Sequence, residues 1–73
     1  MNYPELYSVC RALICTKVVI IYNYDKIYIG TPREVASGNA YKEYHMLIEE
    51  DEYYVHTITL GEGNYFYLYV DYL

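Results

Sequence analysis

The stretch Asn64-Tyr65-Phe66-Tyr67-Leu68-Tyr69-Val70-Asp71-Tyr72-Leu73 decides the fold that this chain is expected to adopt. Read with the two-residue period of a β-strand, it divides into two faces. One face is apolar and consists of Phe66, Leu68, Val70 and Tyr72. The other face carries Tyr65, Tyr67, Tyr69 and Asp71. Tyrosine combines a rigid ring with a hydroxyl group that tolerates water, so this second face is expected to bind another molecule rather than to catalyse a reaction.

Residues 53–60 are expected to pair with this strand in a β-hairpin over about 53–72, through the loop Glu62-Gly63-Asn64 with Gly63 or Asn64 left-handed. Alternation places Tyr54, His56, Ile58 and Leu60 on one face, and Tyr53, Val55, Thr57 and Thr59 on the other. The predicted register sets Leu60 opposite Phe66, Ile58 opposite Leu68 and His56 opposite Val70. On the reverse face it sets Thr59 opposite Tyr67 and Thr57 opposite Tyr69.

The first half of the chain predicts a second hairpin, over about 17–29. Residues 18–22 are apolar on both faces and mostly β-branched, which is typical of a central strand covered on each side. Asn23-Tyr24-Asp25-Lys26 then supplies the turn. Thr31, Pro32 and Glu34 form a capping box, which predicts a short helix at about 32–37 that ends at Gly38.

Two further segments each fit two structures. Pro4 and Glu5 favour the start of a helix over about 4–14, although residues 9–14 also suit a strand. Residues 40–50 fit a helix or a strand of about 42–48. A helix would place Glu49-Glu50-Asp51-Glu52 at the negative end of its dipole, so a strand is favoured. The chain is therefore predicted to be a single α+β domain over residues 1–73, with a small antiparallel sheet of about four to five strands, an N-terminal helix and a short second helix.

Charge is distributed unevenly along the chain, whose net charge is −5. Residues 1–42 contain five basic and three acidic residues, whereas residues 43–73 contain seven acidic residues and neither lysine nor arginine. Such a field repels nucleic acid and anionic membranes and attracts basic surfaces. No signal peptide follows Met1, and the longest apolar run, residues 18–22, is too short to cross a bilayer. We expect a cytoplasmic protein that binds neither nucleic acid directly nor a membrane.

Candidate catalytic and metal-binding residues are few. Cys10 and Cys15 lie five positions apart, which matches neither a C-x-x-C pair nor a zinc framework, so reduced thiols are expected rather than a disulfide. His45 and His56 lack the spacing of a metal site, and neither cysteine has the setting that activates a thiol beside a histidine. Gly61-Glu62-Gly63 places a negative charge where a phosphate-binding loop would hold phosphate. We expect no enzymatic activity, no metal and no cofactor.

The segment Gly30-Thr31-Pro32-Arg33-Glu34-Val35-Ala36, which follows a predicted strand, resembles the opening of small phage and prophage accessory proteins of Gram-positive hosts. The resemblance covers about residues 18–37, and in those proteins the matching helix commonly begins a helix-turn-helix-like unit. This chain departs from that pattern after Ser37, because Gly38 ends the helix and no basic recognition helix follows. The resemblance therefore implies a viral or mobile-element origin, and it does not imply DNA binding.

These observations favour a non-catalytic inhibitor that docks an acidic, tyrosine-rich face onto a basic, nucleic-acid-binding surface of a host protein, for example a nuclease. This type of action resembles that of small acidic phage inhibitors of restriction or CRISPR nucleases. The residues predicted to bind the partner are Tyr53, Tyr65, Tyr67, Tyr69, Asp71, Glu49, Glu50, Asp51 and Glu52.

Several alternatives stay open. The tyrosines at 65, 67 and 69 would pack under the N-terminal helix if they belong to the core. The acidic run at residues 49–52 would be a solvated turn if it faces no partner. The chain would form an oligomer that binds a small aromatic ligand, such as a nucleotide, between its tyrosines, or a homodimer in which residues 65–72 pair as an exposed edge strand.

Overall fold

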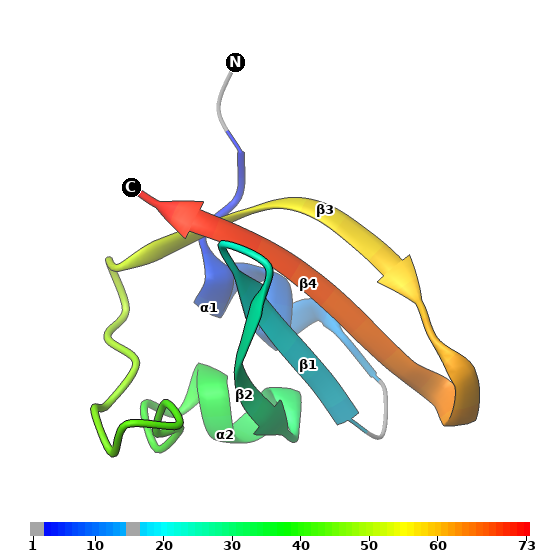
Figure 1. Cartoon of the computed structure of the whole chain (residues 1–73), viewed down its shortest axis with the longest axis horizontal. Coiled ribbons are helices and arrows are strands. Elements are labelled where there is room, and N and C mark those ends of the chain that lie inside the picture. The colour runs from blue at the N-terminus through cyan, green and yellow to red at the C-terminus, as the bar shows by residue number, and fades with distance from the viewer. Residues whose placement is uncertain (1–2, 15–16) are drawn as a thin grey trace.

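Four strands form one sheet, and two short helices cover one side of it (Figure 1). In chain order the elements are α1 (Leu6–Ala12), β1 (Lys17–Tyr22), β2 (Asp25–Gly30), α2 (Pro32–Ala36), β3 (Tyr53–Leu60), the 3-10 turn η1 (Glu62–Asn64) and β4 (Tyr65–Tyr72). The structure is a computed structural model and describes residues 3–14 and 17–73. The predicted α+β class and both predicted hairpins are confirmed, and α1 is shorter than the expected helix of about 4–14.

The sheet is mixed, with strand order β2-β1-β4-β3, because β1 runs parallel to β4 while each hairpin is antiparallel. Both central positions are therefore taken by β1 and β4. The edge strands are β2 and β3, so the expectation that residues 65–72 form an exposed edge is wrong.

Local signals placed the first hairpin and α2 correctly. Asn23 and Tyr24 both have positive φ, of 51° and 68°, as a two-residue turn matching the twist of its strands requires. The Thr31 Oγ1 accepts a 3.2 Å hydrogen bond from the Glu34 amide, and the Glu34 carboxylate accepts one in return from the Thr31 amide. This reciprocal bonding is the predicted capping box.

The predicted register of the second hairpin is confirmed over its outer half and wrong beyond it. Leu60 pairs with Phe66, Ile58 with Leu68, Thr59 with Tyr67 and Thr57 with Tyr69. Val55, and not His56, lies opposite Val70, because the register shifts between Val55 and Thr57 and leaves His56 as the extra residue of a β-bulge. The bulge reverses the alternation, so Tyr53 and Val55 face the core. Gly63 and Asn64 are both left-handed.

Residues 40–52 form neither the favoured strand nor a helix. Only an isolated antiparallel bridge joins Tyr41 to Leu47, and the Ile48 amide donates to the Ala40 carbonyl over 2.9 Å. Ala40 and Ile48 are buried, whereas the tip between them is mostly exposed. Burial of Ala40 and Ile48 holds both ends of this segment, and the residues between them form a loop. This tertiary constraint outweighs the local sequence pattern that favoured a strand.

The core lies between the helices and one face of the sheet. α1 contributes Leu6 and Val9, α2 contributes Val35, and the central strands contribute Ile20 and Leu68. The Tyr7 hydroxyl donates a hydrogen bond to the Ile48 carbonyl and so ties the long loop to α1. Neither helix in the described part of the chain has the length and hydrophobicity needed to cross a membrane.

Tyr28 links the end of β2 to the start of α2. Its hydroxyl donates a 2.9 Å hydrogen bond to a carboxylate oxygen of Glu34, and this bond is the main cause of the lowered pKa of Glu34. The ring crosses directly over Gly30, where a Cβ atom would lie 2.1 Å from the Tyr28 hydroxyl oxygen. Gly30 is therefore needed for close approach.

Gly30→Ala should lower the free energy of unfolding by about 1–3 kcal/mol, because the added methyl group displaces a ring that is held by packing and by Glu34. Chemical denaturation measures this loss. Tyr28→Phe is the control, since it removes only the hydroxyl and should cost about 0.5–1.5 kcal/mol. A Gly30→Ala variant as stable as the native chain would show that the ring moves aside at no cost.

Candidate functional site

The side of the sheet opposite the helices carries the row of tyrosines. Parallel pairing aligns Lys17 with Tyr65, Val19 with Tyr67 and Ile21 with Tyr69. Pairing with the edge strands adds Thr57, Thr59 and Ile29 beside them. We call this surface the tyrosine face: Lys17, Val19, Ile21, Ile29, Thr57, Thr59, Tyr65, Tyr67 and Tyr69. Within residues 3–14 and 17–73, both helices lie on its far side (Figure 1).

The rings of the tyrosine face are half-buried, so they do not pack under α1 as one alternative proposed. They flank the neighbouring strand β1: Val19, which pairs with Tyr67, is only 2% exposed although no described helix covers it. The Tyr67 ring rests against the hairpin backbone, since a Cβ atom at Gly61 would lie 3.1 Å from its Cζ atom. The Lys17 ammonium lies 5.5 Å from the centre of the Tyr65 ring. These contacts hold the rings in place and leave their outer surfaces in solvent.

The acidic run lies apart from the tyrosine face. The Arg11 guanidinium, on α1, forms a 3.0 Å ion pair with Glu50, and Lys42 forms another with Glu52. Burial, followed by the charges of Glu50, Glu49 and Glu52, raises the pKa of Tyr7 on α1. The predicted residues Glu49, Glu50, Asp51 and Glu52 therefore lie on the helix side of the sheet, and two of the four carboxylates are engaged within the chain.

Tyr53 is the predicted contact residue that the structure corrects. It is 1% exposed and faces the core, because the bulge at His56 reverses the alternation of β3. Its ring stacks on Tyr72 at 4.9 Å, and the Lys42 ammonium lies 5.1 Å from the ring centre. Burial is the main cause of the raised pKa of Tyr53. Tyr53 is a packing residue and is not accessible to a partner.

Asp71 keeps the predicted position at one end of β4 and is exposed. It borders a hollow of about 270 Å³, together with Tyr24, His56 and Tyr69. Tyr24 is almost fully exposed at a left-handed turn position, which costs a bulky side chain conformational energy. Sequence reasoning treated Tyr24 only as part of a turn and missed this site, although a tyrosine at a turn tip was a visible signal.

The described residues contain no group of three or more His, Cys, Asp or Glu side chains placed to hold a metal ion.

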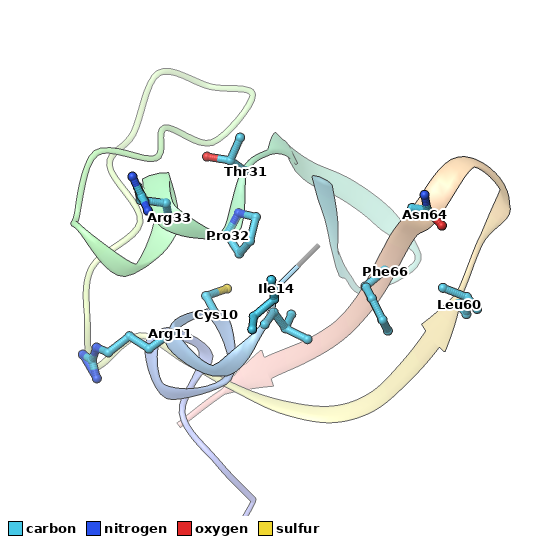
Figure 2. Close-up of a pocket in the computed structure, with 10 residues that line it drawn as sticks. Cys10, Arg11, Ile14, Thr31, Pro32, Arg33, Leu60, Asn64 and Phe66 are labelled. Carbon is cyan, nitrogen blue, oxygen red and sulfur yellow. The ribbon is translucent and has the colours of Figure 1, made fainter. Parts of the chain in front are cut away.

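A larger groove opens on the helix side, between the two helices and the protruding end of the β3–β4 hairpin (Figure 2). It has a volume of about 890 Å³ and is lined by Cys10, Arg11, Leu13, Ile14, Thr31, Pro32, Arg33, Leu60, Asn64 and Phe66. Ile14 faces Phe66 and Leu60, and both arginines come from the helices. The lining brings no histidine to Cys10, and Cys15 lies outside the described residues. No sequence pattern predicts this groove, because its walls are distant in the chain.

No protein family, curated protein or solved structure matches this chain. The function is therefore inferred from the arrangement of its own residues. The tyrosine face sets three partly exposed tyrosine rings in a row on the central strand β4, and it is the candidate functional site.

Tyr53 faces the core and Tyr67 lies on the other face of the sheet, so replacing each of them by alanine should lower the free energy of unfolding by different amounts. Tyr53→Ala should lower the free energy of unfolding by about 3–5 kcal/mol, because it empties a buried aromatic site. Tyr67→Ala should cost less, about 1 kcal/mol, because its ring is only partly buried. Urea denaturation compares the two variants, and equal losses would mean that the tyrosine face belongs to the core.

Proposed function

We propose that this protein is a non-catalytic binding protein whose tyrosine face docks on another protein, and that the partner is a host protein with a basic surface of the kind that binds nucleic acid. The observation that carries the proposal is a row of three half-buried tyrosines on a sheet face that no described helix covers. Occupation of the basic surface would inhibit the partner by competition with its nucleic acid.

The composition of the tyrosine face suits protein recognition. Tyr65, Tyr67 and Tyr69 offer rigid amphipathic rings, which lose little conformational entropy on binding. The threonines of β3 lie on one flank and the exposed Ile29 of β2 on the other. In protein interfaces, aromatic side chains ringed by polar residues often contribute most of the binding free energy.

Charge supports a basic partner at longer range. The net charge of −5 attracts a basic surface before contact. Within the interface, Asp71 is the acidic residue beside the rings, while Glu50 and Glu52 are engaged by Arg11 and Lys42. The electrostatic contribution therefore acts mainly on the association rate, and the aromatic rings act mainly on the dissociation rate.

The proposal is tested by capturing the partner from cells of the native host and then measuring its binding kinetics by surface plasmon resonance. Tyr67→Ala should weaken binding at least tenfold, to judge from the roughly 2 kcal/mol or more of a central aromatic anchor. Raising the ionic strength from about 0.1 M to about 1 M should slow association, because the Debye length falls from about 10 Å to about 3 Å.

Tyr44→Ala is the matched control, because Tyr44 is an exposed tyrosine in the loop of residues 40–52 and lies outside the tyrosine face. It should leave both rates unchanged. The docking proposal fails if Tyr67→Ala and Tyr44→Ala bind alike. The competitive mechanism fails if the captured partner binds nucleic acid and this protein does not displace it.

A second candidate function rests on the hollow beside Tyr24, Tyr69 and Asp71. Two aromatic side chains at the mouth of a cavity suit a small aromatic ligand, such as a nucleotide base, held by stacking. The volume of about 270 Å³ is close to the lower limit of about 300 Å³ for ligand pockets. A thermal-shift screen with nucleotides separates the two functions, because only this one predicts ligand-dependent stabilisation.

A further inference from the structure

The chain protects most of the exposed edges of its sheet. At the β2 edge, the Glu43 amide donates a 3.0 Å hydrogen bond to the Ile27 carbonyl, beside a bulge and the charged residues Asp25 and Lys26. Bulges and charged side chains are the usual means by which proteins stop an edge strand from pairing with another chain. The β2 edge is therefore blocked.

The first half of β3 is also covered. The Val55 amide donates a 2.9 Å hydrogen bond to the Pro4 carbonyl, and Glu5 forms a bridge with Tyr54. The Tyr3 ring stacks on the Tyr54 ring at 5.4 Å. The N-terminal segment thus covers this part of the edge, as far as the bulge at His56, through an isolated bridge.

Beyond the bulge, residues 57–60 are different. In the described part of the chain, no segment other than β4 forms a backbone hydrogen bond with Thr57-Ile58-Thr59-Leu60. This segment contains no charged residue and no proline, and its side chains are β-branched or apolar. Ile58 is 46% exposed and Leu60 71% exposed, both on the helix side of the sheet. An uncharged, uncovered edge of this kind is a template for strand pairing.

We propose that this edge pairs with the same edge of a second copy of this chain, antiparallel and about a two-fold axis near Thr59. The register sets Ile58 opposite Leu60 of the second copy on one side of the sheet, and Thr59 opposite Thr59 on the other. Apolar side chains therefore meet apolar side chains, and hydroxyl meets hydroxyl. The two four-stranded sheets become one continuous sheet.

Charge argues for a second copy in spite of the net charge of −5. The pairing segment is uncharged, and His56 and Glu62 lie at its two ends. Antiparallel pairing brings His56 of each copy toward Glu62 of the other, so the carboxylates of the two Glu62 residues do not meet each other. The acidic turn of residues 49–52 is engaged with Arg11 and Lys42 beyond the covered half of β3, which keeps the main negative cluster away from the two-fold axis.

The groove of Figure 2 enlarges the contact. Pairing of two four-residue segments by itself buries much less than the approximately 1,200–2,000 Å² of a standard interface. Ile14, which is fully exposed, and Phe66 line the groove beside Leu60 and extend the apolar surface on the same side of the sheet. Because the total contact area remains small even with these residues, we expect a weak dimer that forms only at high protein concentration.

Sedimentation velocity of the full chain, from micromolar to millimolar concentration, tests this proposal. The native chain should change from monomer to dimer as its concentration rises. Ile58→Lys should weaken dimerisation at least about tenfold, because it places a charged lysine opposite Leu60 of the other copy, on both sides of the two-fold axis. Ile29→Lys is the matched control: it changes an isoleucine that is 55% exposed on the blocked edge strand, and it should leave dimerisation unchanged.

Hydrogen exchange on the native chain provides a readout that needs no variant. Those amides of residues 57–60 that point away from β4 should gain protection as the dimer forms. A chain that stays monomeric at millimolar concentration overturns the proposal and leaves this edge to an extended segment of another protein. Equal effects of Ile58→Lys and Ile29→Lys, with circular dichroism showing both variants folded, also overturn it. Ile58→Lys changes a side chain on the helix side of the sheet and should leave partner binding by the tyrosine face intact, so the failure of the tyrosine-face proposal is distinguishable from the failure of this one.

Discussion

The parallel pairing of β1 with β4 is the interaction on which the rest of the structure depends. Each hairpin is local, and a two-stranded hairpin is at best marginally stable alone. The β1–β4 ladder joins residues 17–22 to residues 65–70 across most of the chain and produces one four-stranded sheet. The same pairing brings Ile20 beside Leu68, and both are fully buried under the helices. Without it, neither the core nor the tyrosine face has a continuous surface.

A chain of 73 residues has too little helix to cover both faces of this sheet. α1 and α2 cover one face and leave the outer end of the β3–β4 hairpin projecting beyond them, where the groove opens. On the other face, tyrosine fills two roles. Its ring shelters Val19, while its hydroxyl edge meets water, so the face is stable without a partner and remains available to one.

Sequence patterns correctly predicted the features of the fold that depend on residues close together in the chain. The capping box of Thr31 and Glu34, the turn at Asn23 and Tyr24, and the register of Leu60 against Phe66 follow from signals within a few residues. The bulge at His56 does not, because period-two alternation continues unbroken through that residue. Its cause is tertiary: Tyr53 fills a core site next to Tyr72. The ion pairs of the acidic turn were equally hidden, because Arg11 is 39 residues from Glu50.

The two proposed binding surfaces lie on different parts of the fold and are compatible with each other. Edge pairing about an axis perpendicular to the sheet keeps the tyrosine faces of both copies on the same side. In the proposed dimer, a partner with a repeated or extended basic surface would meet two tyrosine faces at once, and the second contact would form at high effective concentration. Two weak contacts would then give tight binding without a larger domain. For a chain of this size, the proposed association would add contact area and stability to a single small core.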